Sequence, residues 1–151
     1  MSKPSWVEKV SGKSRWIRAT KLEEEGRFEE AAKLYVEEAE SHTEERPAMA
    51  GLGFLSAAKS MLKAGKRSKA VKLFERAAKS YIKHAEDVKT VSPKTAAWSY
   101  RMASKCYAWA EMYEESEEAR RIADSITEKV EGVEEYPLFK VFKPKKGSGL
   151  R

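Results

Sequence analysis

The chain repeats one ten-residue pattern: Gly26-Arg27-Phe28-Glu29-Glu30-Ala31-Ala32-Lys33-Leu34-Tyr35 recurs as Gly65-Lys66-Arg67-Ser68-Lys69-Ala70-Val71-Lys72-Leu73-Phe74. In both copies a glycine precedes a polar stretch, an alanine and, four residues later, an aromatic residue. A looser third copy begins at Glu111. Repetition at a spacing of roughly 20–50 residues is typical of arrays of stacked helices. The repeat therefore predicts a helical array and directs attention toward binding rather than chemistry.

Around the repeat, apolar residues recur at the spacing of amphipathic helices. Glycine and proline mark the boundaries, with Gly26 and Gly65 as turns and Arg46-Pro47 as a helix end. Ser92-Pro93 is a helix start, since serine caps and proline suits the first turn. The sequence predicts a short helix at 4–10, followed by a break at 11–12. Further helices are predicted at 13–25, 28–41, 47–64, 95–110 and 113–130. Another is predicted around 70–82 and is expected to end near residue 86.

The expected fold is all-α, in one domain covering residues 1–135. After it comes a short alternating stretch, Pro137 to Phe142, followed by a basic run. We expect residues 136–151 to form an extended basic tail, partly disordered beyond Lys145, with the alternating stretch lying against the helices.

The helix pairs resemble tetratricopeptide repeats. That motif has a small residue in its first helix, glycine in the turn, and alanine, an aromatic residue and alanine again in its second helix. The second copy has all five of these residues in register. They are Ala58, Gly65, Ala70, Phe74 and Ala77.

The other two copies match this motif less fully. The first has Ala19, Gly26, Ala31 and Tyr35, with Glu38 at the last position. The third has Ser104, Glu111, Tyr113, Ser116 and Ala123, and lacks the aromatic residue of the second helix. Repeat spacings of 39 and 46 residues exceed the usual 34, and such long helices are similar to the soluble NSF-attachment-protein branch. The resemblance covers residues 13–130 and implies a right-handed superhelix of about three antiparallel helix pairs.

Charge is distributed in blocks along a chain whose formal net charge is +6. Residues 27–45 hold seven Glu and two basic residues, whereas residues 59–83 hold nine Lys or Arg and one Glu. Residues 111–135 are acidic again, and the tail is basic. One interpretation is charge complementarity between neighbouring helices together with solvated faces. The other is a basic central groove that receives an acidic partner.

The resemblance implies that a ligand binds the concave face, which the first helix of each pair lines. Counting from each turn places Leu55 there in the second pair and Lys13, Trp16 and Thr20 in the first. A groove of cations and aromatic rings can hold carboxylates through charge-assisted hydrogen bonds, with tryptophan as an anchor. The alternative is that the tryptophans pack between repeats and the cations confer solubility. The candidate groove residues are Ser56, Lys59, Lys63, Trp98, Arg101, Lys105 and Trp109.

Other functions find less support. The chain contains no Asn, which argues against the carboxylate clamp of some tetratricopeptide domains, although Lys59, Arg101 and Lys105 have suitable positions. His42 and His84 lie in different repeats and form no pair of metal ligands. Cys106 lies beside alanine and tyrosine on a predicted helix, so we interpret it as a buried small residue. No catalytic motif is recognisable. We therefore expect no enzyme activity, cofactor or metal.

No apolar run is long enough for a membrane span, and the first residues lack the apolar core of a signal peptide, so we expect a cytoplasmic protein. The favoured function is a protein–protein interaction module or adaptor for an acidic protein segment. Two alternatives stay open. One is an RNA- or ribosome-associated protein that uses the basic residues 63–83 and the tail, and the other is a structural subunit of a larger complex.

Overall fold

A computed structural model describes the backbone of residues 5–133 and the side chains of residues 14–131. Within that range the chain is all-helical and contains no strand, as the sequence predicts. The predicted tail, residues 136–151, lies outside the described residues. The six helices are α1 (Ser5–Glu24), α2 (Phe28–Glu40), α3 (Pro47–Lys63), α4 (Arg67–Val88), α5 (Pro93–Trp109) and α6 (Tyr113–Val133).

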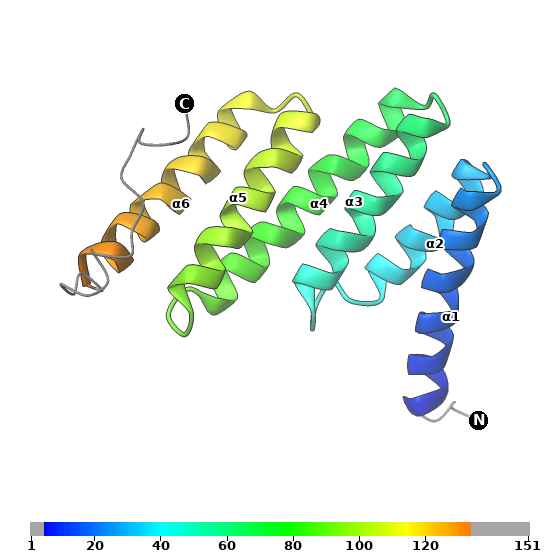
Figure 1. The fold of residues 1–151 in the computed structure, drawn as a ribbon, viewed down its shortest axis with the longest axis horizontal. Helices are drawn as coiled ribbons and strands as arrows, with labels where there is room; N and C mark the ends of the chain where they lie inside the picture. Colours follow the sequence, from blue (N-terminus) through cyan, green and yellow to red (C-terminus); the bar gives the residue numbers. More distant parts are fainter. Residues whose placement is uncertain (1–4, 134–151) are drawn as a thin grey trace, which may run out of the picture.

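The helices follow one another across the molecule in chain order, from α1 at one end to α6 at the other (Figure 1). Each helix packs mainly against the helix before it and the helix after it. A core built this way depends on neighbours throughout, because no helix buries its apolar stripe alone.

The predicted break at Ser11-Gly12 is wrong, because α1 runs without interruption from Ser5 to Glu24. The separate helix expected at 4–10 is the first part of α1. A single glycine in a helix costs only about 1 kcal/mol relative to alanine. With no proline beside it, Gly12 does not have to end the helix.

Three turns of the same geometry end α1, α3 and α5. Gly26 and Gly65 have φ values of +78° and +76°, and Glu111 has φ 64°. In each turn this left-handed residue donates its N–H three residues back, and the following N–H reaches five residues back, as in Arg27 N to Leu22 O at 2.8 Å. This is the Schellman cap, which satisfies the last carbonyls of a helix. The third repeat therefore keeps the turn without the glycine.

The motif residues form the core, as the repeat pattern predicts. The helical motif residues of the first and second copies are all buried, and the two turn glycines are exposed. In the third copy Ser104 and Ala123 are buried, whereas Tyr113 is exposed.

Between the copies α3 approaches its neighbours closely through glycine. A Cβ added at Gly53 would lie 2.7 Å from the Ala39 Cβ of α2, and one at Gly51 would lie 2.9 Å from the ring of Tyr81 in α4. Larger residues at either position would push the helices apart.

Ion pairs link the acidic block of α2 and the turn after it to the basic block of α4 and the turn before it. Arg76 bonds Glu40 at 3.2 Å, and Lys83 bonds Glu44 at 2.9 Å. Lys66 lies 3.7 Å from Glu29. The expected charge complementarity between helices is thus confirmed here. We name this surface, where charges of the α2 and α4 blocks meet, the paired seam.

Candidate cationic and aromatic face of α3 and α5

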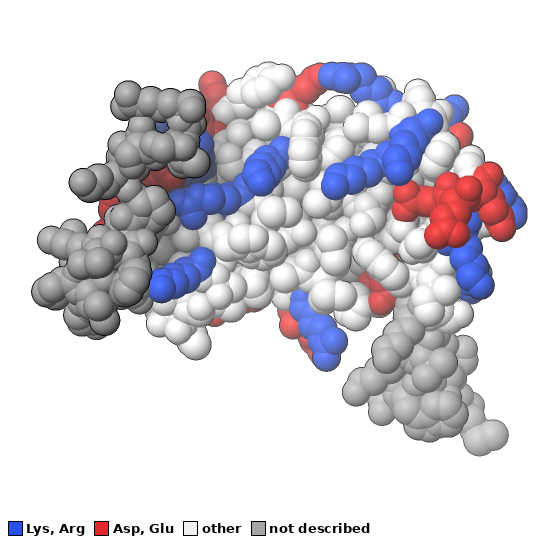
Figure 2. Space-filling model, viewed as in Figure 1, with Lys and Arg blue, Asp and Glu red and all other residues white. Residues whose placement is uncertain are grey.

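α3 and α5 differ from the other helices in charge. Neither contains a single Asp or Glu, while both contain Lys or Arg. By contrast α2 contains five Glu and one Lys. In Figure 2 the middle of the molecule, over α3, α4 and α5, is mostly uncharged and crossed by Lys and Arg, whereas acidic side chains gather at the end over α1 and α2. An acidic ligand would meet little repulsion on such a surface.

Lys59 and Trp109 are the two predicted groove residues that the structure brings into contact. The Lys59 ammonium lies 5.8 Å from the centre of the Trp109 ring, within the range of a cation–π interaction. The other side of the contact is packed, because Trp109 lies 5.4 Å from Phe74 of α4. Trp109 nevertheless keeps 46% of its surface exposed. It therefore packs against α4 and is still partly exposed to solvent.

Lys105 lies one helical turn before Trp109 on α5 and is exposed. Among the described residues, neither Lys105 nor Lys59 has a carboxylate within ion-pair distance. Both ammonium groups act on the buried thiol of Cys106. Burial raises the pKa of Cys106 to about 12, and the two cations lower it slightly. The face thus holds two cations around Trp109 whose charge no described acid neutralises.

Trp98 occupies the other end of the same face of α5. Its ring meets Tyr81 of α4 edge-on, with 6.0 Å between the centres, and 51% of its surface stays exposed. Tyr81 is buried, and burial raises its pKa to about 12. Trp98 therefore combines both interpretations from the sequence, because it packs on the core and also offers an exposed ring.

Two predicted groove cations turn toward neighbouring helices instead. Arg101 donates from one guanidinium nitrogen to Thr127 at 2.8 Å and to Asp124 at 3.3 Å, both in α6. Lys63 bonds Glu23 of α1 at 3.3 Å and lies over the ring of Phe28. These contacts tie α5 to α6 and α3 to the first helix pair.

Five further predicted residues belong to α1 and α3. Ser56 is half-buried on α3, Leu55 beside it is buried, and Trp16 packs edge-on against Tyr35 at 4.8 Å. Thr20 lies 3.4 Å from the same Tyr35 hydroxyl. The side chain of Lys13 lies outside the described residues. The first helix pair thus uses its predicted groove residues mainly for packing.

Most of the basic residues between 63 and 83, which the sequence offered for phosphate binding, form ion pairs with carboxylates. Arg76, Lys79 and Lys83 each bond a carboxylate, and Arg67 pairs with Glu111. On α4 itself, Lys69 and Lys72 are exposed, and no described carboxylate lies within ion-pair distance of either. Compensated charge attracts phosphates weakly, since each paired cation already has its counterion.

Two exposed apolar residues extend the face, and sequence reasoning did not select them. Met49 and Leu52 lie on α3 with 44% and 40% of their surface exposed. They precede Ser56 and Lys59 at the three- to four-residue spacing that places residues on one side of a helix. That spacing was the available signal, but apolar residues at helical spacing equally indicate core.

A further polar cluster joins α1 to α2 and the turn after it. Glu38 is buried and accepts from Arg15 Nε at 3.0 Å, and the ring Nε2 of His42 lies 2.7 Å from its other oxygen. Within the described residues, no group of three or more His, Cys, Asp or Glu could hold a metal ion. No described helix combines the length and apolarity required to cross a membrane.

No family model, curated protein or solved structure matches this chain. The resemblance to tetratricopeptide repeats consequently rests on the motif residues and their packing.

Proposed function

We propose that the protein is a non-catalytic, tetratricopeptide-like interaction module that captures an acidic segment of a partner protein. In this proposal the helices form a right-handed superhelix of antiparallel pairs, with α3 and α5 lining the binding face. Two observations support that arrangement. The helical motif residues of the first two copies are buried, and the turns after α1, α3 and α5 all have the left-handed cap.

The observation that carries the binding proposal is a difference in charge compensation. The cations of α4 are mostly matched by carboxylates, whereas Lys59 and Lys105 have no described acid beside them. Ammonium groups that keep their charge available can form charge-assisted hydrogen bonds with a partner's carboxylates. Placing them on helices without Asp or Glu also removes competing internal acids.

The aromatic rings complete the proposed mechanism. Tryptophan is over-represented among residues that dominate binding energy, because it buries a large area with few rotatable bonds. Trp109 and Trp98 are both held by α4 aromatic rings, so they are pre-organised before a ligand arrives. Met49 and Leu52 supply apolar surface on α3. The matching ligand is an amphipathic segment with carboxylates beside leucine or aromatic residues.

The test uses a fluorescein-labelled synthetic peptide in which Glu and Leu alternate at helical spacing. We expect saturable anisotropy with the wild-type protein, and at least about tenfold weaker binding in the Lys59→Glu/Lys105→Glu double variant, because two charged contacts become repulsive. The matched control is Lys69→Glu/Lys72→Glu, which reverses two exposed, unpaired lysines on α4 and changes net charge equally. Binding should persist in the control.

Measurements on the same variants distinguish peptide binding from the two alternatives, which are RNA binding and a structural role in a larger complex. Equal losses in both double variants would show that only overall charge matters and would refute the site. Retention on polyuridine that falls steeply with salt, and is lost in Lys69→Glu/Lys72→Glu, would favour RNA. Concentration-dependent sedimentation without peptide binding would favour a structural subunit.

A further inference from the structure

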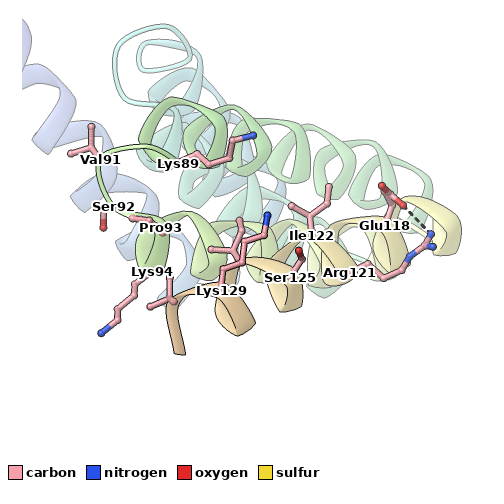
Figure 3. Close-up of a pocket in the computed structure, with 12 residues that line it drawn as sticks. Lys89, Val91, Ser92, Pro93, Lys94, Glu118, Arg121, Ile122, Ser125 and Lys129 are labelled. Carbon is pink, nitrogen blue, oxygen red and sulfur yellow. Dashed lines mark hydrogen bonds and ion pairs between the residues drawn. The ribbon is translucent and has the colours of Figure 1, made fainter. Parts of the chain in front are cut away.

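A cavity of about 930 Å³ opens between the α4–α5 turn and α6, away from the proposed binding face. Its floor is a stripe on α6, Ile122, Ile126 and Val130, spaced by four residues so that all three lie on one side of the helix. Val91 and Pro93 of the turn form the opposite wall, and Val91 is 86% exposed. Figure 3 draws the residues that line the cavity, with Val91, Pro93 and Ile122 among those labelled. A valine so exposed beside an isoleucine stripe indicates apolar surface that the described residues leave uncovered.

The rim of the cavity is positively charged. Lys89 contributes from the end of α4 and Lys129 from α6, and neither has an ion-pair partner among the described residues. In Figure 3 the Lys89 and Lys129 side chains project from opposite sides of the hollow. Arg121 is also on the rim, but it pairs with Glu118 at 2.9 Å. The cavity thus suits a segment that carries carboxylates followed by apolar side chains.

The chain itself supplies such a segment immediately beyond α6. Helix α6 ends at Val133, three residues after the last floor residue, Val130. The next residues are Glu134 and Glu135, and then the alternating stretch 136–142. Alternation in an extended chain places Phe139 and Val141 on one side and Lys140 on the other.

The segment is also long enough to turn back along the cavity. From Glu118 to Val130 helix α6 makes twelve residue steps and rises about 18 Å, at roughly 1.5 Å per residue. The nine residues 134–142 can span up to about 30 Å when extended. The chain can therefore leave α6, reverse and cover the isoleucine stripe within that length.

We propose that residues 134–142 dock in this cavity as an extended cap on the end of the array. Glu134 and Glu135 complement Lys129 and Lys89 in charge, and Phe139 and Val141 match the apolar stripe of Ile122 and Ile126. Tethering gives the segment a local concentration in about the millimolar range, which favours it over a free ligand. A second copy is disfavoured as the occupant, since both molecules carry a net charge of +6 and repel each other.

Disulfide trapping in the full chain tests the docking. Cys106 is replaced by alanine, and the pair Ser125→Cys and Val141→Cys is introduced, because Ser125 lines the cavity and is exposed. In the matched control the first cysteine is moved to Ser68→Cys, which is exposed on α4 and does not line the cavity. With oxidised glutathione we expect the Ser125/Val141 pair to close within one molecule at least about tenfold faster than the control, whatever the protein concentration.

Equal rates in the two pairs would overturn the proposal, and so would disulfide-linked dimers that increase with protein concentration. A second variant adds Phe139→Asp to the Ser125/Val141 pair. We expect it to slow closure at least about tenfold, because burying a carboxylate on the isoleucine stripe is costly. Unchanged closure in that variant would also refute docking. Far-UV circular dichroism confirms that each variant is folded before its rate is compared.

Discussion

Helices α3 and α5 each have two faces with opposite properties. On its packed sides α3 sets Gly53 against the backbone of α2 and Gly51 against the Tyr81 ring of α4. Its other face presents Leu52 and Lys59 to solvent. On α5, Cys106 is fully buried while the adjacent Lys105 is exposed. The motif residues lie on the packed faces. The residues on the open faces are not fixed by the motif, so they can differ from one copy to the next.

The largest contrast between the two faces should appear in thiol chemistry. We expect Cys106 to react with a disulfide reagent at pH 8 at least about 100-fold more slowly than Lys105→Cys in a Cys106→Ala background. The thiolate is the reacting form, and burial raises the pKa of Cys106 to about 12. The measurement is the labelling rate by absorbance. Comparable rates would show that the face of α5 assigned to the core is open.

The same buried groups make stability depend on alkaline pH. Cys106 and Tyr81 ionise with pKa values raised by burial to about 12 in the folded protein, against reference values of 9.0 and 10.0. The folded state holds these protons more tightly than the unfolded state. Stability from these groups is therefore complete below about pH 9 and falls as the pH rises toward 12. Urea midpoints measured across this range should decline, and a flat profile would contradict the burial of both groups.

Gly53→Ala should break the packed face of α3. The new methyl group would meet the Ala39 Cβ at 2.7 Å and its backbone at 3.1 Å, and neither can rotate away. We expect the free energy of unfolding to fall by about 1–3 kcal/mol, even though alanine favours helix over glycine by about 1 kcal/mol. Urea denaturation measures the change.

Ser56→Ala is the matched control, because it also introduces alanine in α3 but at a half-buried position. We expect a change within about 0.5 kcal/mol, as for most surface substitutions. If Gly53→Ala proved as mild as Ser56→Ala, the close approach of α2 and α3 would be wrong.

The packed faces were the part of the fold that could be predicted from sequence. Ala58, Gly65 and Phe74 repeat in a register that only helix stacking explains, and they are buried or in the turn as expected. Glu111 shows the limit of such reasoning. It takes the left-handed conformation that glycine favours, because the backbone bonds of the cap fix that turn.

The open faces could be predicted only in part. Counting from the turns assigns both Lys59 and Trp109 to the groove, and the structure brings them into contact. The direction of Arg101 was not predictable, because it depends on Asp124 and Thr127, which lie more than twenty residues further along the chain. The cavity beside Val91 likewise arises from how the α4–α5 turn lies against α6. Contacts of this kind leave no local pattern.

The smallest expected effect concerns the paired seam, where the cations are matched by carboxylates. A double-mutant cycle of Arg76→Ala and Glu40→Ala isolates their ion pair, since Arg76 also lies 4.2 Å from the ring centre of Phe54. Both partners are substantially exposed, so we expect a coupling of only about 0.2–1 kcal/mol, measured by urea denaturation. The coupling should shrink in 1 M salt, where charges are screened. A coupling above this range would mean that the seam holds α2 and α4 together through charge. A small one would show that these ion pairs contribute little to stability, although they still place carboxylates beside Arg76, Lys83 and Lys66.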